Sequence, residues 1–427
     1  MKAAVEDASI AAESASASGR ASSDGRREPL RVCHVGYTFY ESDNRLLRYA
    51  TSLVKRGDTV DVLALRRPGG ARRAELNGVQ VYCLQQRNVN ERQAWVYFLK
   101  VVLFALRATC YLGVRHVRRR YDVVHVHNIP DFLVFAAIVP RLMGARVILD
   151  IHDVVPELYS GKFGAGSASF VPNVLLRVER ASCRFADHVI VANHLWQQKL
   201  VQRSVSTVKC TALMNYPDTT IFRMATAPTK ALKPFTFLYH GTLNRHQGLD
   251  IAVAAFAKAA PALPNAELHI YGEGPTRSSL QEQALRLGVG ERVKFMSARP
   301  LTEIAQIVAA ADVGVVPKRA DGFGNEAFST KVLEFMACGV PVIVARTKVD
   351  DYYFRDTQVR FFTPGSDDDL AVQMRWAFEQ RDERARIAAA GHDYAREQRW
   401  EKHEGAYFSI VDRLGSLATG EAPHLCV

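Results

Sequence analysis

Short apolar segments rich in β-branched residues recur along the chain from residue 30 onward, and helical segments lie between most of them. Each apolar segment is nearly continuous, as expected for strands that are covered on both faces. The alternation of strand and helix therefore predicts a doubly wound α/β fold built on parallel sheets. In the first half of the chain, the expected strands are 31–36, 59–65, 79–84, 122–127, 146–152 and 187–192.

This alternation stops at 213–234, a Pro- and Thr-rich stretch without periodicity, and then starts again. A chain of 427 residues is long for one core, so two domains are expected. We therefore expect two Rossmann-like domains facing each other across a cleft, with ligands at the carboxyl ends of the strands. In the second half, the expected strands are 235–240, 266–272, 292–297, 313–317, 340–345 and 359–362.

The composition indicates a folded, basic protein with reduced cysteines. The 55 Lys and Arg against 44 Asp and Glu give a net charge of +11, which favours an acidic partner: a nucleotide, a nucleic acid or an anionic membrane. The seven cysteines are scattered without a CxxC pair, so a cytoplasmic protein without structural zinc is expected. Residues 1–29 are Ala- and Ser-rich and lack the apolar stretch of a signal peptide, which predicts a disordered tail.

Residues 94–114 form an apolar segment long enough to span a bilayer, but they include Lys100 and Arg107. Two charges within a span cost about 2.5–3.5 kcal/mol each, which disfavours a transmembrane helix. Two other interpretations stay open. The helix packs against a sheet, or it lies partly in the membrane interface with the basic cluster Arg115–Arg120 on anionic lipid.

The stretch NEAFSTKVLEFMACGVPVI at 325–343 has the pattern of a short helix followed by a strand. Its periodicity predicts a helix at about 330–338, with Ser329 or Thr330 as the N-cap and Gly339 just after the end. The face expected to be buried consists of Val332, Leu333, Phe335 and Met336.

Three charged residues of this stretch suggest a ligand. Lys331 lies in the first helical turn, where a cation opposes the helix dipole unless an anion such as a phosphate is bound. Glu334 is on the same face one turn later and could accept hydrogen bonds from a ribose diol. Glu326 precedes the helix and could meet a second polyol, so the pattern suggests a nucleotide-sugar. A solvated surface helix with Lys–Glu salt bridges is the alternative.

The segment STKVLEFMACGVPVI resembles the Lys-x-x-Glu-x-Met-Ala-x-Gly-x-Pro-Val core of glycosyltransferase family 4, the retaining glycosyltransferases of the GT-B fold. The likeness extends from about residue 30 to 415. The other segments that carry it, in family order, are DVVHVHNIPDF (122–132), LDIHDVVPELY (149–159), MNYPD (214–218), LYHGTLNRHQGLDIAVAAF (238–256), ELHIYGEGP (267–275) and ADVGVVP (311–317).

The resemblance implies a division of the chain into functional domains. The expected parts are an acceptor domain at 30–212, a linker at 213–234, a nucleotide-sugar-binding domain at 235–400, and a C-terminal helix and tail at 401–427 that return toward the first domain.

The resemblance also implies roles for donor-site residues. Glu334 would bind the ribose, Lys331 the diphosphate and Glu326 the transferred sugar. The family commonly has Arg and Lys where this chain has Thr242 and Gln247, so either Arg245 or His246 would take over phosphate binding. The remaining donor-binding residues are Gly241, Thr242, Arg245, Arg299 with the base nearby, and the backbone of Phe328, Ser329 and Thr330.

In the N-terminal half, the resemblance implies that His127 is an active-site residue near the transferred sugar. His125 precedes it by two and should point to the same face. His152 and Asp153 end the next strand and are expected to face the acceptor. Arg45 is a further acceptor candidate, with a salt bridge at a helix start as the alternative. The segment 161–169 is expected to act as a mobile lid.

We therefore expect a retaining glycosyltransferase that moves a sugar from a nucleotide-diphosphate sugar to a saccharide or lipid-linked acceptor, in cell-surface polysaccharide synthesis. A GT-B epimerase or hydrolase, and a non-catalytic basic interaction protein, are the alternatives. We expect no cofactor and no nucleic acid partner. We also expect no metal, since the acidic run 367–369 is typical of a helix start. The expected location is cytoplasmic, and an anionic membrane surface stays open as a partner.

Overall fold

The computed structural model describes residues 28–87, 94–163, 170–224 and 234–418. Contacts divide these residues into two compact units. Unit 1 contains the described residues up to Pro156, those at 170–214 and those at 403–418. Unit 2 contains 157–163, 215–224 and 234–402. Nearly all of the expected tail, most of the expected lid and the second half of the expected linker lie outside the described residues.

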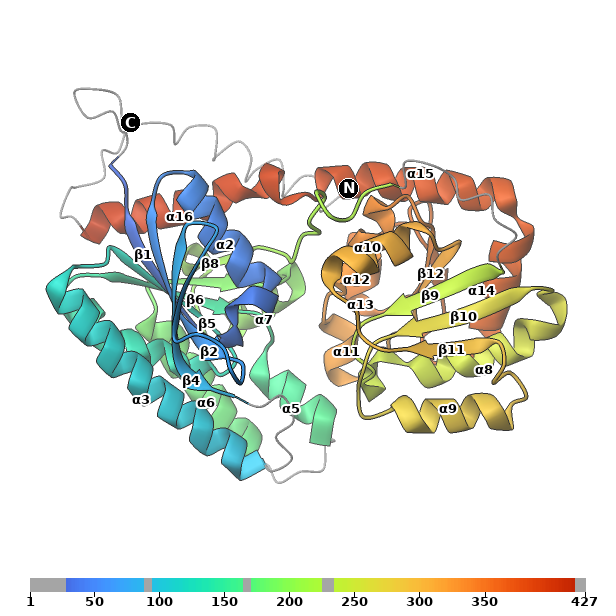
Figure 1. Cartoon of the computed structure of the whole chain (residues 1–427), viewed down its shortest axis with the longest axis horizontal. Coiled ribbons are helices and arrows are strands. Elements are labelled where there is room, and N and C mark those ends of the chain that lie inside the picture. The colour runs from blue at the N-terminus through green and yellow to red at the C-terminus, as the bar shows by residue number, and fades with distance from the viewer. Residues whose placement is uncertain (1–27, 88–93, 164–169, 225–233, 419–427) are drawn as a thin grey trace. The chain divides into compact units, whose positions relative to one another are not determined.

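An eight-stranded sheet forms the centre of unit 1 (Figure 1). Its strand order is β3-β4-β2-β1-β5-β6-β7-β8, and neighbouring strands are parallel except for the antiparallel pair of β3 and β4. The strands are β1 Arg31–Phe39, β2 Thr59–Arg66, β3 Arg73–Leu76, β4 Val79–Gln86, β5 Val123–His127, β6 Arg146–Ile151, β7 His188–Val191 and β8 Cys210–Ala212.

Helices pack on both faces of this sheet. On one face Tyr49 of α2 stacks on Tyr407 of α16 at 4.3 Å, and the Tyr407 hydroxyl lies 3.0 Å from Nδ1 of His125 in β5. On the other face Arg115 of α3 donates to Asp61 of β2. The helices along this part of the chain are α2 Asn44–Lys55, α3 Ala94–Arg118, α4 Ile138–Leu142, α5 Val155–Phe163, α6 Phe170–Phe185, α7 His194–Arg203 and α16 Trp400–Ala418, with short 3-10 helices η1 Tyr40–Ser42, η2 Asp131–Ala137 and η3 Thr207–Lys209.

Unit 2 contains a six-stranded sheet, all parallel, in the order β11-β10-β9-β12-β13-β14. The strands are β9 Phe235–His240, β10 Ala266–Tyr271, β11 Val293–Met296, β12 Val313–Val316, β13 Val342–Ala345 and β14 Arg360–Phe362. The helices are η4 Arg245–Gln247, α8 Leu249–Ala259, η5 Ala260–Ala262, α9 Arg277–Arg286, α10 Leu301–Ala309, α11 Gly322–Glu326, α12 Thr330–Ala337, α13 Lys348–Tyr353, α14 Asp367–Glu379 and α15 Arg381–Glu397.

Two apolar cores lie on opposite faces of this second sheet. One is formed with α8, α9 and α14, and the other with α10, α12 and α15. The prediction of parallel α/β sheets is therefore confirmed for both units.

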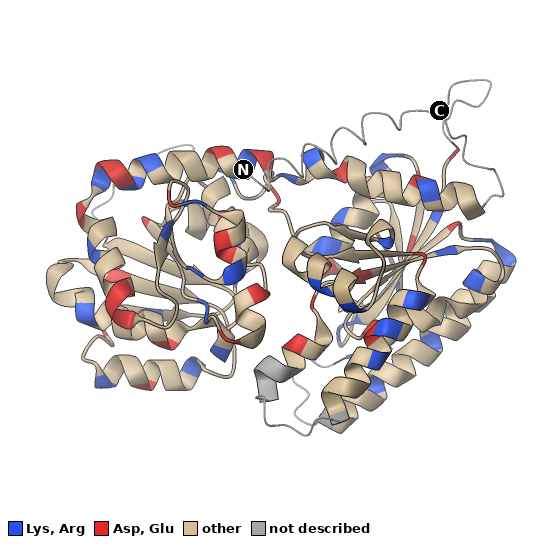
Figure 2. Ribbon diagram, turned by 180° about the vertical axis from the view of Figure 1, so that it is seen from behind, with Lys and Arg blue, Asp and Glu red and all other residues tan. Residues whose placement is uncertain are grey.

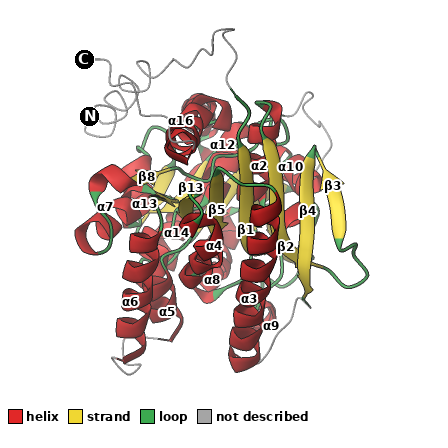
Figure 3. Cartoon of the chain, turned by 90° about the vertical axis from the view of Figure 1, so that its left-hand side faces the viewer, coloured by secondary structure: helices red, strands yellow, loops and turns green. Residues whose placement is uncertain are grey.

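Strand β3, which pairs with the expected strand β4, is the main element that the periodicity missed. All four residues of β3 are exposed, so this edge strand carries no apolar pattern (Figure 3). The signal was instead in the turn, because Asn77 and Gly78 both have positive φ, at 53° and 78°. An Asn-Gly pair between two strands is the strongest short-range sequence signal for a hairpin.

Helix α12 forms where the sequence predicted it and buries the expected face. Val332, Leu333, Phe335 and Met336 are at most 1% exposed. Gly339 has φ of +69° after the helix end, as a C′ glycine should. Ser329 occupies the N-cap position but makes no side-chain capping hydrogen bond.

Close packing of α12 on β12 depends on Gly314. A Cβ atom at Gly314 would lie 2.6–2.7 Å from three ring atoms of Phe335, which is well inside van der Waals contact. The missing side chain therefore sets the distance between this helix and the sheet.

Helix α3 packs on unit 1 through one face only. Val101, Phe104, Ala108 and Leu112 are buried. On the opposite side, every third or fourth residue belongs to an apolar stripe. Each member of this α3 stripe is exposed: Trp95, Leu99, Leu103, Leu106, Cys110, Val114 and Val117.

By length and composition Trp95–Arg118 could cross a membrane, with mean hydropathy 1.5 and only 28% of its most apolar window buried. The helix therefore packs against the sheet through one face and leaves its outer apolar face open.

We predict that Gly314→Ala destabilises unit 2 by about 1–3 kcal/mol, because the added methyl group overpacks against Phe335. Gly405→Ala is the control, since Gly405 lies in α16 with open space around a new Cβ. That control should be neutral or stabilising by up to about 1 kcal/mol. Denaturant unfolding of both variants decides it, and equal effects would show that Gly314 does not set the packing distance.

Candidate functional site

Two glycines leave the backbone bare at the carboxyl edge of the second sheet. Gly241 follows β9 with φ of +126°, and Gly272 follows β10 with φ of +144°. A Cβ at Gly272 would lie 1.8 Å from the Gly241 carbonyl oxygen, and one at Gly241 would lie 2.4 Å from Cε of Lys331. Only glycine fits at either position, so Lys331 lies directly against exposed backbone.

Lys331 is a cation without a close carboxylate. Its Nζ lies 5.5 Å from the ring centroid of Tyr239, and within the described residues no carboxylate oxygen lies within 4 Å of it. Burial lowers the pKa of the Lys331 ammonium, while Glu334 acts in the opposite direction. A partly buried ammonium is costly unless it is paired, which makes the space in front of it suitable for an anion.

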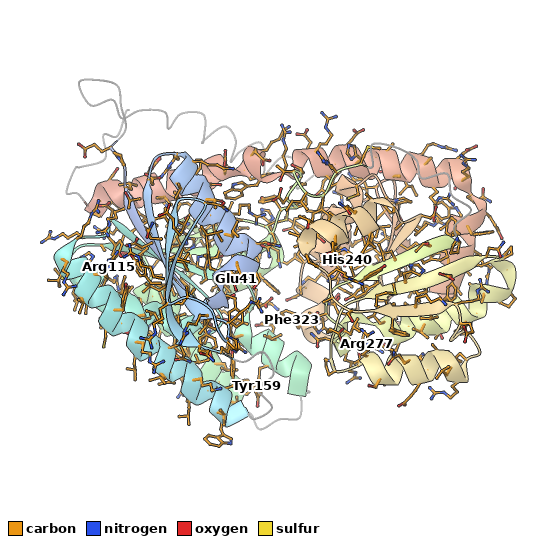
Figure 4. The ribbon with its side chains drawn as sticks, viewed as in Figure 1. Glu41, Arg115, Tyr159, His240, Arg277 and Phe323 are labelled. Carbon is orange, nitrogen blue, oxygen red and sulfur yellow. The ribbon has the colours of Figure 1, made fainter. Side chains whose placement is uncertain are left out.

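Glu334 lies one turn after Lys331 and is close to His240, the last residue of β9. Figure 4 labels His240. Its Oε2 lies 3.4 Å from His240 Nε2. Burial raises the pKa of Glu334 to about 7, against the effect of Lys331. Burial, together with Lys331, lowers the pKa of His240 to about 3, so the imidazole is neutral at physiological pH. The carboxylate thus lies beside a neutral imidazole and keeps acceptor capacity for a ligand.

The N-terminus of α12 adds backbone donors beside Lys331. The first N–H groups of a helix have no partner within the helix, and they carry partial positive charge. Ser329 is buried at the N-cap and its Oγ has no hydrogen-bond partner among the described residues. Phe328, by contrast, packs its ring on Tyr353 at 4.9 Å, which leaves its backbone rather than its side chain for a ligand.

The loop after β9 contains Arg245 and His246, the two candidates to replace the usual phosphate-binding residues of the family. Burial, and then Lys331, lowers the pKa of His246. Gln247 Nε2 lies 2.9 Å from His246 Nε2 and fixes that ring. Arg245 and Thr242 are exposed, and the Thr242 carbonyl accepts a hydrogen bond from the Tyr239 hydroxyl.

Glu326 has a partner that sequence analysis missed. Its Oε1 lies 3.1 Å from Lys348 Nζ, and the Lys348 N–H donates to Asn325 Oδ1 at 2.8 Å. No motif in the sequence identifies Lys348. It belongs to α13 and comes near Glu326 only because α11 packs on that helix.

A buried ion pair supports the segment that carries Glu326. Lys318 Nζ lies 2.8 Å from Asp350 Oδ2 and donates to the Ala327 carbonyl at 2.7 Å. Both side chains are at most 3% exposed, so the loop between β12 and α12 is anchored to α13. Arg299, the residue expected near the base, precedes α10 and is half exposed. Its Nη1 lies 3.8 Å from Glu303 Oε2 in the first turn of that helix.

In unit 1 a row of buried imidazoles connects three neighbouring strands. His34 Nδ1 lies 2.9 Å from His127 Nε2. His127 Nδ1 lies 3.1 Å from His152 Nε2 and 3.3 Å from Asp150 Oδ2. His152 Nε2 lies 3.2 Å from the same oxygen. His125 and His127 share a face, as expected, with ring centroids 4.3 Å apart.

The histidines of this row differ in charge preference and exposure. Burial lowers the pKa of His34, His125 and His127. Burial also opposes charge on His152, but the Asp150 carboxylate raises its pKa. The His127 side chain is 1% exposed and that of His152 is 19% exposed. His152 is therefore the member of the row that a ligand could reach without rearrangement.

Arg45 is the structural partner of Asp150. Its Nε and Nη2 each donate to one Asp150 oxygen at 2.8 Å, and its Nη1 donates to the Leu213 carbonyl at 2.7 Å. Its side chain is 2% exposed. Burial alone would raise the pKa of Asp150, but Arg45 holds it well below its usual range. The geometry thus favours the salt bridge over acceptor binding for Arg45, although the partner is on β6 rather than at the helix start.

Asp153 lies next to this row. Its carbonyl accepts from Asn128 Nδ2 at 2.8 Å, and burial raises the pKa of its carboxyl group. Two groups of side chains have metal-ligand chemistry, His34 with His125 and His127, and His127 with Asp150 and His152. Their atoms already contact each other, and Arg45 occupies both Asp150 oxygens, so the present arrangement favours a hydrogen-bonded row over a cation site.

Comparison with known structures identifies the fold. Sucrose-phosphate synthase from Thermosynechococcus elongatus superposes with a TM-score of 0.71 and 18% identity, over 90% of this chain and 98% of that one. The Anabaena protein HepE, solved with UDP and glucose, has a TM-score of 0.69 and 16% identity, over 90% and 99%. The two sheets are those of the GT-B fold.

Sequence comparison covers both units. The chain is 24% identical over 256 residues to the gpi3 subunit of phosphatidylinositol N-acetylglucosaminyltransferase from Schizosaccharomyces pombe, matching 59% of this chain and 52% of that protein. The chain thus spans about half the length of this curated relative. Residues 42–215 match the glycosyl transferase 4-like domain, and residues 223–394 match the glycosyl transferases group 1 family. With one family model on each unit and a GT-B fold, the chain belongs to the group 1 glycosyltransferases of the family 4 type.

Proposed function

We propose that this chain transfers a sugar from a nucleotide-diphosphate sugar to a saccharide or lipid-linked acceptor, with retention of the anomeric configuration, in cell-surface polysaccharide synthesis. One observation carries the proposal. The Lys331 ammonium faces bare backbone at Gly241, beside the N-terminus of α12, and has no carboxylate partner among the described residues. Such a site suits a diphosphate. The HepE structure, which contains UDP and glucose on a similar fold, supports the same interpretation.

Glu334 supplies the second part of the donor site. It lies one turn along the same helix face as Lys331, where its carboxylate can accept from the hydroxyls of a ribose. The departing diphosphate gains negative charge during transfer, so stabilisation by Lys331, the helix N–H groups and His246 lowers the barrier. No group needs to act as a covalent nucleophile or to bind a metal in this scheme.

Glu326 and His127 are proposed to position the transferred sugar. Lys348 holds Glu326 at the end of α11, where the carboxylate can accept hydrogen bonds from sugar hydroxyls. His127 has partners on both ring nitrogens, so it would contact a sugar only by exchanging one of them. His152, the more exposed neighbour, and Asp153 are proposed to orient the acceptor.

We further propose a cytoplasmic enzyme that works at the inner face of a membrane. The exposed apolar stripe of α3 continues for the whole helix, and the helix contains no Asp or Glu. Figure 2 marks the Lys and Arg residues along it. An apolar face flanked by cations is typical of helices that lie in an anionic membrane interface.

We predict that Glu334→Ala weakens binding of the free nucleoside about 10- to 100-fold, the loss expected for charge-assisted hydrogen bonds of about 1.5–3 kcal/mol. In the unmodified protein, nucleoside affinity should rise with pH through about 7, because the raised pKa of Glu334 leaves a carboxylate only above that value. Glu334→Gln should abolish this pH dependence. Calorimetric titration measures both, and unchanged affinity in Glu334→Ala would remove Glu334 from the site.

Glu326→Ala should retain nucleoside diphosphate affinity and lose sugar transfer, because its proposed partner is the sugar alone. Titration calorimetry and a transfer assay on the same preparation separate the two effects. A parallel loss of nucleotide binding would place Glu326 on the nucleotide instead.

Lys331→Ala should weaken binding of the nucleoside diphosphate much more than binding of the free nucleoside, since only the former presents phosphate to the ammonium. Lys258→Ala is the control, because Lys258 is an exposed lysine of unit 2 that pairs with Asp367 and Asp368. An equal loss for both ligands would show that Lys331 is structural.

We predict that the unmodified protein floats with anionic vesicles in a density gradient. The double variant Leu99→Glu with Leu106→Glu should instead stay at the bottom of the gradient. Both residues are more than half exposed on the α3 stripe, so the substitutions should not disturb the core. Leu285→Glu, at an equally exposed site on α9, should float normally. An unmodified protein that does not float with anionic vesicles at low salt would contradict the membrane proposal.

A further inference from the structure

A hollow of about 850 Å³ lies in unit 1 between the edge hairpin and α3. Figure 3 shows β3 and β4 at this edge of the sheet and α3 on its face. The hollow is away from the histidine row, which the sheet separates from α3. None of the roles proposed for the sugar donor or acceptor uses it.

The lining of this hollow is strongly cationic. No Asp or Glu belongs to it, whereas six of its thirteen residues are Lys or Arg. These are Arg66, Arg72, Arg73, Lys100, Arg107 and Arg115. A concave site of one charge sign within protein walls concentrates ions of the opposite sign.

Most of these cations contact neutral groups. Arg66 donates to the Gly70 carbonyl, Arg73 to Gln80 and Arg107 to Gln85. In the described part of the chain, no ion pair with a carboxylate is found for these three or for Arg72. Arg115 differs, since it pairs with Asp61 at 3.0 Å. The hollow thus has a large excess of positive charge.

Two tyrosines give the hollow a fixed wall. The rings of Tyr82 and Tyr111 lie 5.4 Å apart, and Arg115 lies 4.6 Å above the Tyr82 ring while donating to its hydroxyl at 2.8 Å. Gln85 bridges to α3 by donating to the Lys100 carbonyl at 3.0 Å. The site is therefore built from packed side chains rather than from unsupported surface arginines.

The hollow adjoins the apolar stripe of α3. Leu103 belongs to both, and Lys100 and Arg107 are on the same helix, separated by two turns. A ligand with an anionic head and an acyl tail would place the head among the cations and the tail along the stripe. A nucleic acid would satisfy the cations but leave the stripe exposed to water, so it fits the two features less well.

We propose that this hollow binds the phosphate headgroup of an anionic phospholipid while the α3 stripe enters the bilayer interface. The site gives the membrane contact a preferred lipid and a fixed orientation. The proposed lipid site rests on the proposed function in one respect, because a lipid-linked acceptor would require the enzyme to work at the membrane.

The test compares two pairs of neutralising substitutions in the full chain. Arg72→Gln with Arg73→Gln removes two cations of the hollow. Both residues are exposed, Arg72 just before β3 and Arg73 as its first residue. Arg286→Gln with Arg381→Gln removes the same charge from exposed positions on α9 and α15. Melting temperatures check that all proteins are folded.

The first measurement is partition into phosphatidylcholine vesicles with and without phosphatidylglycerol. A blue shift of tryptophan emission reports the partition, because Trp95 is 65% exposed on the stripe. The variant Trp95→Phe shows how much of the shift comes from Trp95. The hollow variant should bind phosphatidylglycerol vesicles about 30-fold more weakly, because each basic residue near an anionic surface contributes about fivefold to binding. The control pair should change binding less than about threefold. Equal losses in both pairs would mean diffuse attraction and overturn the site.

The second measurement uses soluble probes and calorimetry. Short-chain phosphatidylglycerol below its micelle concentration should bind with one-to-one stoichiometry, and short-chain phosphatidylcholine should not. Tighter binding of inorganic phosphate or of an oligonucleotide than of the lipid probe would overturn the assignment to lipid. Titration of nucleoside diphosphate into the same protein separates the lipid site from the proposed donor site. If the nucleotide does not bind, the donor site is contradicted, whereas the lipid site is still tested by the vesicle measurement.

Discussion

The candidate site of the second unit is built around one partly buried cation, Lys331, which lies against backbone that carries no side chain. Gly241 and Gly272 provide that backbone, and Gly314 lets α12 approach the sheet closely enough to bring Lys331 there. A helix start already has positive potential, so a lysine in its first turn is locally unfavourable. The cost is recovered when an anion binds, because the ammonium and the N–H groups then share one partner. Local conflict of this kind is expected at functional sites.

In the first unit the main electrostatic feature is a buried carboxylate, that of Asp150. Asp150 is fully buried, and Arg45 matches both of its oxygens, so the charge is compensated before any histidine is considered. The imidazoles of His127 and His152 can then remain near the carboxylate in fixed orientations. Because His152 has the raised pKa and the greater exposure, protonation changes in this row should begin there. The row therefore links the buried carboxylate to the one imidazole that a ligand can reach.

The sequence was sufficient for the elements that are fixed by periodicity, and for residues placed by spacing on one element. All strands of both sheets except β3 and β8, the buried face of α12, and the common face of Lys331 and Glu334 were of this kind. Contacts between distant segments were not predictable, because the chain gives no local sign of them. The pairing of Lys348 with Glu326 and of Arg45 with Asp150 belongs to this class. The cationic hollow also depends on packing, since α3 and the edge hairpin come together only in the folded unit.

The central claim is that unit 2 holds a nucleotide-diphosphate sugar. It is tested most directly by a thermal-shift panel of nucleoside diphosphates and their sugars on the unmodified protein. A ligand present at 100 times its Kd stabilises the folded state by about 2.7 kcal/mol, which raises Tm by several degrees in a domain of this size. The account predicts such a shift for at least one nucleotide-sugar, and a smaller shift for the matching free nucleoside. A folded protein whose Tm is the same with every nucleotide and nucleotide-sugar would contradict it.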